Sequence, residues 1–217
     1  MTVERGAPWG ARTVRPPGLR TVEGDRELAL AFDDGSEVPT GARSGDMLRT
    51  LGVQARARPE DGLVDGAVGG LGGPDVLAVP IDLVRVQLDG VAAGLVVAHL
   101  VIRAAHRRGG LLRGPVVLVM NAEFIGDWDV APRGHPNDGR IEVVSFAPGM
   151  PLRQRLAARR KLCSASHMPH PDISSRSVAE ASWAFDRPMT VIADGHRLGT
   201  ARSVEITVLP DAATLHV

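Results

Sequence analysis

The sequence predicts an α+β fold that is rich in β-strands, and the main observation behind it is a series of short apolar runs bounded by turn signals. Residues 116–120 form a continuous apolar run that is too short for a helix and is typical of a buried strand. A Pro-Asn-Asp-Gly turn signal at 136–139 precedes a second apolar run at 141–144. We therefore expect a strand, a long polar loop and another strand at the centre of the chain.

The C-terminal part repeats this alternation. An apolar run at 189–193 meets Asp194-Gly195, which is a hairpin signal, and strand-like runs follow at 204–209 and 214–217. Strands are thus predicted to dominate after residue 116 and to pack as a sandwich-like lobe.

The first fifty residues carry weaker signals. Residues 1–20 hold several prolines and glycines without periodicity and are predicted to form an irregular arm. The apolar run 28–32, which an Asp-Asp-Gly turn closes, is interpreted as a strand. Asp46 or Ser44 can cap a short helix that Gly52 ends.

The next fifty residues lead into the central strand. Residues 55–80 are rich in glycine and are expected to be a flexible connection, without the strand and helix context of a phosphate-binding loop. A strand is predicted at 80–86, ending at the Asp89-Gly90 hairpin signal. Residues 91–107 fit either a helix or a pair of strands, and His99 is interpreted as a core or edge histidine.

A basic segment follows the central strands. Residues 151–162 place leucines among four arginines and one lysine, which fits either a solvated helix face or a helix attracted to anionic lipid headgroups. Further on, Pro169 separates His167 from His170 and prevents a helical pair of zinc ligands, so these histidines are interpreted as structural.

Composition limits the class of protein. The 217 residues suffice for one large domain or two small lobes, and 25 basic against 25 acidic residues create no overall field that would attract nucleic acid. The absence of Tyr also disfavours base-stacking modules. A single cysteine, Cys163, fits a reducing compartment. The longest apolar stretch, 91–102, is too short to span a bilayer, so we expect a cytoplasmic protein, with peripheral attachment at the inner membrane face as an option.

The central stretch VLVMNAEFIGDWDVAPRGHPNDGRIEVV resembles the second lobe of the diacylglycerol kinase family of lipid kinases, which are relatives of sphingosine and NAD kinases. The family has a strand that ends in Asn, a glycine-containing loop, an "AP" dipeptide and "NDG" before the next strand. Asn121, Ala131-Pro132 and Asn137-Asp138-Gly139 match this order and spacing, and Gly126 keeps one glycine of the loop.

Shorter matches extend the resemblance to both sides. Asp46 and the Arg-Thr-Leu-Gly run after it are similar to the family's "GTGNDFARTLGI", and Asp82 stands at the acidic position of "VDLGRVNG". Asp194-Gly195-His196 resembles "VDGE", with His196 in place of Glu. Gly24 and Asp25 are what remains of "GGDGT", the loop that approaches nucleotide phosphates in the family.

The resemblance implies ATP-dependent phosphoryl transfer to a lipid hydroxyl, with magnesium as a second cofactor. It implies Asp194 as the general base, and Gly24, Asp25, Asp46, Asp82 and Asn121 as residues that bind the cofactors. In some relatives the NDG loop holds a structural metal, which would make Asp138 a ligand in a rigid loop and direct its side chain inward.

The resemblance also divides the chain. It implies an arm at 1–20, a reduced α/β nucleotide-type lobe at 21–86 and a β-rich lipid-kinase lobe at 87–217. Glu23 and Glu27 flank the degenerate loop and would repel a triphosphate, which predicts millimolar ATP affinity or weaker. A second hypothesis is therefore a catalytically inactive module of this family that binds or regulates, acting with a protein partner or as a homodimer.

Overall fold

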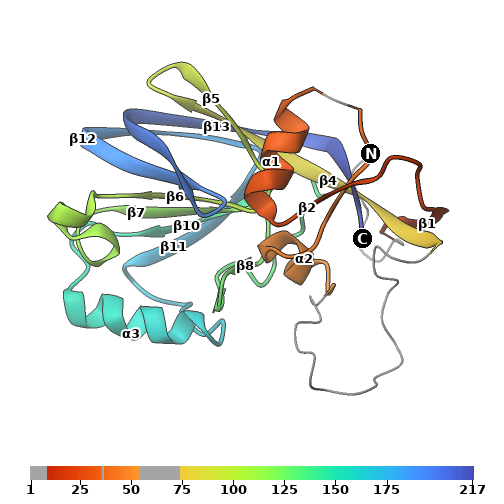
Figure 1. Ribbon diagram of the computed structural model, residues 1–217. Helices are drawn as coiled ribbons and strands as arrows, with labels where there is room; N and C mark the ends of the chain where they lie inside the picture. The colour runs from red at the N-terminus through yellow and green to blue at the C-terminus, as the bar shows by residue number, and fades with distance from the viewer. Residues whose placement is uncertain (1–8, 36, 54–73) are drawn as a thin grey trace.

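The computed structural model describes residues 9–35, 37–53 and 74–217. Of these residues, 49% lie in strands and 16% in helices, which confirms the predicted α+β, β-rich class. Eleven strands form one sheet (Figure 1), in which β1, β4, β13, β12, β6, β7, β10 and β11 are neighbours in that order, while β5 pairs with β4 and β2 pairs with β3.

The described part of the first half of the chain contains six strands, two short α-helices and two 3-10 helices. The elements are β1 (Ala11–Val14), β2 (Arg20–Val22), α1 (Asp25–Asp33), β3 (Thr40–Ala42), α2 (Asp46–Thr50), β4 (Asp75–Leu88), β5 (Val91–Val96), β6 (His99–Arg103) and the 3-10 helices η1 (His106–Arg108) and η2 (Gly110–Leu112). The second half contains β7 (Val116–Met120), β8 (Phe124–Ile125), β9 (Trp128–Asp129), β10 (Ile141–Phe146), α3 (Leu152–Leu162), β11 (Ile173–Val178), β12 (Glu180–Ala193) and β13 (His196–His216).

Strand β7 is apolar throughout because it is buried on both faces. Val117 and Val119 belong to one core cluster, while Val116, Leu118 and Met120 belong to another that also holds residues of α3. Side chains of a strand alternate between the two faces of a sheet, so a strand covered on both sides needs apolar residues at every position. This confirms the buried strand that the run 116–120 predicts.

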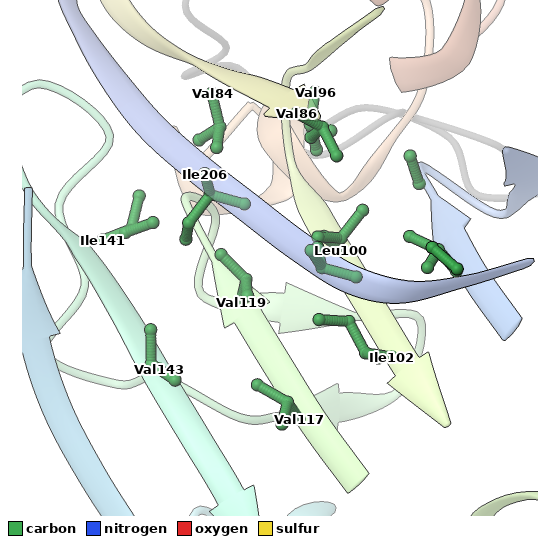
Figure 2. Packing of buried hydrophobic residues seen from close by; sticks show 14 of the residues in the cluster. Val84, Val86, Val96, Leu100, Ile102, Val117, Val119, Ile141, Val143 and Ile206 are labelled. Atoms are coloured by element: carbon green, nitrogen blue, oxygen red, sulfur yellow. The ribbon is translucent and has the colours of Figure 1, made fainter. Parts of the chain in front are cut away.

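The sheet folds over itself into two layers (Figure 1). Strands β4, β13 and β12 supply one layer, and β6, β7 and β10 supply the other. Side chains such as Val86 and Ile206 from the first layer meet Leu100, Val119 and Val143 from the second (Figure 2). The predicted sandwich-like packing of the strands after residue 116 is thus present, with β4 as an additional member.

Both Asp-Gly signals form tight hairpin turns. Asp89 and Gly90 have φ values of +50° and +78° between β4 and β5, and Asp194 and Gly195 have +46° and +79° between β12 and β13. Positive φ at both central residues is the type I′ geometry that suits the twist of paired strands. Residues 91–103 accordingly form a pair of strands, β5 and β6, rather than a helix.

The interpretation of residues 28–32 as a strand is wrong, because they lie within α1. Leu28, Ala29 and Ala31 are buried whereas Leu30 is 55% exposed. This is the burial pattern of one helix face, and Leu and Ala are strong helix formers. Helix α1 packs beside β5 and β3, and α2 completes a core cluster with the ends of β4 and β13.

Two further expectations need correction. The arm at 1–20 is not wholly irregular, since β1 pairs with β4 and β2 pairs in parallel with β3. The flexible connection predicted at 55–80 falls mostly outside the described residues, but from Asp75 onward the chain is in β4. The division into lobes at residue 86 stays a prediction, and β4 runs through that position.

No helix in the described part of the chain is long and apolar enough to cross a membrane.

Candidate functional site

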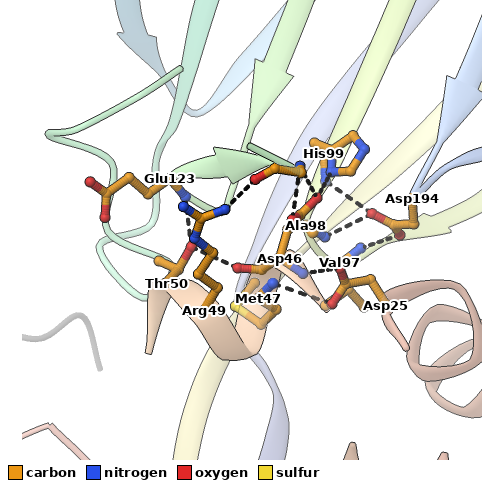
Figure 3. Close-up of polar contacts among 11 residues, drawn as sticks. Asp25, Asp46, Met47, Arg49, Thr50, Val97, Ala98, His99, Glu123 and Asp194 are labelled. Atoms are coloured by element: carbon orange, nitrogen blue, oxygen red, sulfur yellow. Dashed lines mark hydrogen bonds and ion pairs between the residues drawn. The ribbon is translucent and has the colours of Figure 1, made fainter. Parts of the chain in front are cut away.

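Three carboxylates from distant parts of the sequence converge where the helices meet the sheet (Figure 3). Asp25 begins α1, Asp46 begins α2, and Asp194 lies in the turn between β12 and β13. Asp25 accepts hydrogen bonds from the backbone N–H groups of Asp46 and Met47, at 2.6 and 3.3 Å. The carboxylate of Asp25 thus caps the first turn of α2.

Gly45 makes this contact possible. Its φ is +131°, and a Cβ at this position would lie 2.3 Å from Oδ1 of Asp25. No side chain fits there without moving the Asp25 carboxylate. Gly45 therefore allows Asp25 to pack closely against the start of α2.

Asp46 connects α2 to the loop after β7. Its two carboxylate oxygens lie 3.0 and 3.1 Å from the backbone nitrogen of Gly126, which donates to them. Arg49 donates to the Gly126 carbonyl and stacks 4.0 Å above the Phe124 ring. The Thr50 hydroxyl accepts from the N–H of Glu123 at 2.8 Å. The resemblance drew attention to Gly126 and Asp46, and the structure places them in direct contact.

Asp194 has a buried carboxylate that is held by backbone amides. Its Oδ1 accepts from Ala98 and His99, and its Oδ2 accepts from Val97, each at 2.9 Å. These bonds fill three of the roughly four acceptor positions of a carboxylate. The Asp194 carboxylate is therefore buried rather than exposed in a cleft, and it holds the turn between β5 and β6.

Burial disfavours the charged forms of the carboxyls in this cluster. Burial, followed by the charge of Asp194, raises the pKa of Asp25 to about 7, with Asp46 adding to the effect. Burial also raises the pKa of Asp194, against the lowering effect of its backbone hydrogen bonds and of His99. By contrast, the exposed Asp89, in the same kind of turn, has a pKa lowered by its hydrogen bond from the Ser203 amide. Burial of several carboxylates together is what sets the cluster apart.

His99 is a member of this site that sequence reasoning assigned to the core. Its ring is buried, its Nδ1 lies 3.5 Å from Oδ2 of Asp46, and its backbone N–H donates to Asp194. A separation of 3.5 Å suits an ion pair if the ring is protonated and is long for a hydrogen bond. Nothing in the spacing around His99 indicates this neighbourhood, because it depends on the turn of β12 and β13 reaching the start of β6.

Asp82 does not join these carboxylates. It is fully buried on β4, where Oδ2 accepts from Gly139 at 2.7 Å and Oδ1 accepts from Asp211 at 2.8 Å. Burial raises its pKa to about 6, and the charge of Asp138 adds to this. Asp82 therefore anchors two segments to the middle of the sheet. One is the Asn-Asp-Gly loop, and the other is the part of β13 around Asp211, where the register against β4 shifts.

The side chain of the loop that faces inward is Asn137 and not Asp138. Asn137 is fully buried and donates to Oδ1 of Asp211 at 2.8 Å. Asp138 is half-buried, and its Oδ1 accepts from the backbone of Arg140 at 2.9 Å. Within the described residues, no group of three or more His, Cys, Asp or Glu is arranged to hold a metal ion. A role for Asp138 as a metal ligand thus stays a prediction from the resemblance.

Asn121 and Gly24 complete the set of sequence-predicted residues. The Asn121 amide donates to the carbonyls of Asp82 and Val97, at 2.8 and 2.7 Å, and so links the two groups of carboxylates through the backbone. Gly24 precedes α1 in an extended conformation, between the exposed Glu23 and Glu27. The roles of Asn121 and Gly24 in cofactor binding stay predictions.

Comparisons with known proteins support the fold. No protein-family model matches the chain, and no curated protein matches it. Solved structures from Bacillus anthracis strain Sterne do match. One, named as a candidate diacylglycerol kinase, has 14% identity and a TM-score of 0.61, with 91% of this chain and 77% of that chain covered. A second of that name has 12% identity, a TM-score of 0.59 and the same coverage.

A third structure, named as a diacylglycerol kinase, has 14% identity and a TM-score of 0.57, and the match covers 91% of this chain and 75% of the other. At these identities the likeness establishes a shared fold. The chain therefore has a diacylglycerol-kinase-like fold, and what it does must be argued from its own residues.

Proposed function

We propose that this protein transfers a phosphoryl group from a magnesium-bound nucleotide to a lipid hydroxyl at the cluster of Asp25, Asp46 and Asp194. The observation that carries the proposal is the convergence of these buried carboxylates, with the pKa of Asp25 raised to about 7 and that of Asp194 raised as well. Burying like charges together is costly unless a cation neutralises them. The lipid-kinase-like fold supports the reaction class.

The donor set suits a cation that arrives with its nucleotide. Magnesium prefers oxygen ligands, keeps several waters, and needs only one or two carboxylates when phosphates supply further ligands. Asp25 and Asp46 are the residues that would hold it. Bound there, magnesium would neutralise the charge of the transferring phosphoryl group.

Asp194 would accept the proton of the lipid hydroxyl. Oδ2 accepts one backbone hydrogen bond whereas Oδ1 accepts two, so Oδ2 is the oxygen with more remaining acceptor capacity. A carboxyl with a raised pKa is a stronger base than an ordinary aspartate once it is ionised. His99 and the three amides would fix its orientation.

A catalytically inactive binding module is the second candidate. It is favoured by the hydrogen bonds that hold Asp194 in the turn, and by the exposed Glu23 and Glu27 on either side of Gly24. Two negative side chains beside a triphosphate would weaken nucleotide binding. Under this alternative the Asp25 cluster would serve only to join the helices to the sheet.

The two candidates differ in one assay. We expect the wild-type protein to transfer labelled γ-phosphate from ATP to a short-chain diacylglycerol in the presence of magnesium. Asp46→Asn keeps an acceptor for the Gly126 amide but removes the charge, so transfer should fall roughly a hundredfold or more, as for the loss of other transition-state electrostatic groups. The control Asp127→Asn changes an exposed carboxylate on the same loop and should alter the rate by no more than about twofold.

Absence of transfer by a folded wild-type protein, over a range of lipid alcohols, would favour the inactive module. Equal rates for Asp46→Asn and Asp127→Asn would show that transfer, if seen, does not use this cluster.

A further inference from the structure

A strongly basic face lies at the end of the molecule opposite to α1 and α2, the helices that carry Asp25 and Asp46. It is formed by α3 and by residues 103–113, the segment that contains η1 and η2, and Figure 1 shows both at the same end. The two segments are in contact through α3 and η2. Neither residues 103–113 nor α3 contains an Asp or a Glu, although the whole chain has 25 acidic and 25 basic residues. We call this surface the basic face.

Most cations of the basic face are exposed, namely Arg107, Arg108, Arg113, Arg153, Arg159, Arg160 and Lys161. The two exceptions, Arg103 and Arg155, are buried. Arg155 donates to the carbonyls of Met150, Leu111, Gly114 and Ala147. Arg155 thus fixes α3 against the η2 segment, so that the exposed cations of both stand on one rigid surface.

Exposed leucines lie among these cations. Leu152 and Leu156 on α3 are 47% and 42% exposed, and Leu112 on η2 is 37% exposed. Helix α3 buries only Arg155, Ala158 and Leu162, so most of its circumference faces outward. Exposed leucines beside cations can add apolar contacts to an attachment that is mainly electrostatic at a membrane surface.

An open apolar recess adjoins the face. It is small, with a volume of about 40 Å³, and is lined by α3, η2 and the strands beneath them, including Leu111, Leu118, Phe146 and Leu162. Arg159 and Trp128 both line the recess, and the Arg159 guanidinium carbon lies 5.4 Å from the centroid of the Trp128 ring. Cations beside an apolar hollow match a lipid, which presents an anionic headgroup next to hydrocarbon. A nucleic acid would use the cations but not the leucines or the recess.

We propose that the basic face docks the protein on the surface of an anionic lipid bilayer. The proposal deepens the proposed function, since a lipid acceptor would be met at such a surface, but the docking itself needs neither nucleotide nor catalysis. Of the two interpretations of residues 151–162, the structure favours lipid attraction because the neighbouring segment adds cations and leucines to the same face. Each exposed cation is expected to strengthen attachment about fivefold.

Co-sedimentation with vesicles, in the absence of nucleotide, tests the docking. We expect the protein to bind vesicles of phosphatidylcholine mixed with phosphatidylserine, to bind phosphatidylcholine alone far more weakly, and to be released by salt. The triple variant Arg159→Gln, Arg160→Gln, Lys161→Gln should bind about a hundredfold more weakly. A matched control, Arg12→Gln, Arg176→Gln, Arg187→Gln, removes three exposed cations elsewhere and should change binding by about twofold at most.

A second variant, Leu152→Ala with Leu156→Ala, keeps every charge and a helix-forming residue at each position. It should weaken vesicle binding, and melting curves should confirm that all variants remain folded. The proposal is overturned if the wild-type protein ignores anionic vesicles, if the control triple variant loses as much binding as the α3 variant, or if the leucine pair has no effect. Because phosphorylation of a short-chain diacylglycerol in solution does not require a bilayer, failure of docking and failure of the proposed kinase activity are separate results.

Discussion

Asp194→Asn should both destabilise the protein and abolish any phosphoryl transfer. In the wild-type protein the two carboxylate oxygens accept three backbone amides. The carboxamide has one oxygen, so either the N–H of Val97 or those of Ala98 and His99 would face an NH₂ group. Leaving a buried donor unsatisfied costs about 1–3 kcal/mol. Burial raises the pKa of Asp194, so removing its charge offsets part of this cost, and we expect a net loss of about 2 kcal/mol.

Asp89→Asn is the matched control for this change. Asp89 occupies the same Asp-Gly turn position, but its Oδ1 alone accepts from Arg202 and Ser203, and it is exposed. An amide oxygen can keep both bonds, so the melting temperature should stay close to that of the wild-type protein. Thermal unfolding measures both variants, with about 2–4 °C expected per kcal/mol for a chain of this size. Equal melting temperatures for Asp89→Asn and Asp194→Asn would contradict a holding role for Asp194.

Asp82→Ala should be the most destabilising change in the loop region, larger than Asp138→Ala. Asp82 is fully buried, and its two oxygens accept from Gly139 and Asp211. Truncation removes both acceptors at once and leaves a cavity, so we expect a loss of about 3 kcal/mol or more. Asp138 accepts only from the Arg140 amide at the loop surface, and its loss should cost about 1 kcal/mol.

Denaturant unfolding of the two variants, with Asp127→Ala as an exposed reference, gives this comparison. The expected order of stability is Asp127→Ala, Asp138→Ala, then Asp82→Ala as the least stable. If Asp138→Ala proved as damaging as Asp82→Ala, a role beyond the Arg140 contact, such as a bound cation, would be required.

Local sequence patterns predict the strands that are buried on both faces and the two-residue hairpin turns. The run 116–120 is apolar throughout because β7 is covered on both faces, and the Asp-Gly pairs at 89–90 and 194–195 adopt the positive φ values that two-residue hairpins need. The run 28–32 misleads because Leu-Ala-Leu-Ala-Phe fits a short strand as well as one face of a helix. The packing of α1 against β3 and β5 decides between them, and no local pattern contains it.

The site shows the same limit. Order along the sequence and family resemblance identify the aspartates, but only the fold sorts them into two groups. Asp82 meets Asp211 because β4 pairs with β13, 129 positions later in the chain, whereas Asp25 and Asp194 meet where α1 approaches the β12–β13 turn. His99 enters the site through the same turn. Gly45 is explained only by the position of the Asp25 carboxylate.

The central claim is that Asp25, Asp46 and Asp194 form a carboxylate cluster that receives a cation with its nucleotide. Titration of the Asp25 carboxyl carbon by NMR, with and without magnesium and ATP, measures this directly. Alone, Asp25 should titrate near pH 7, because burial and Asp194 disfavour its charged form. A bound cation favours the charged form, so magnesium and ATP together should lower the pKa towards the ordinary value of 3.8. A pKa near 3.8 in the free protein, or a pKa near 7 that magnesium and ATP leave unchanged, would contradict the account.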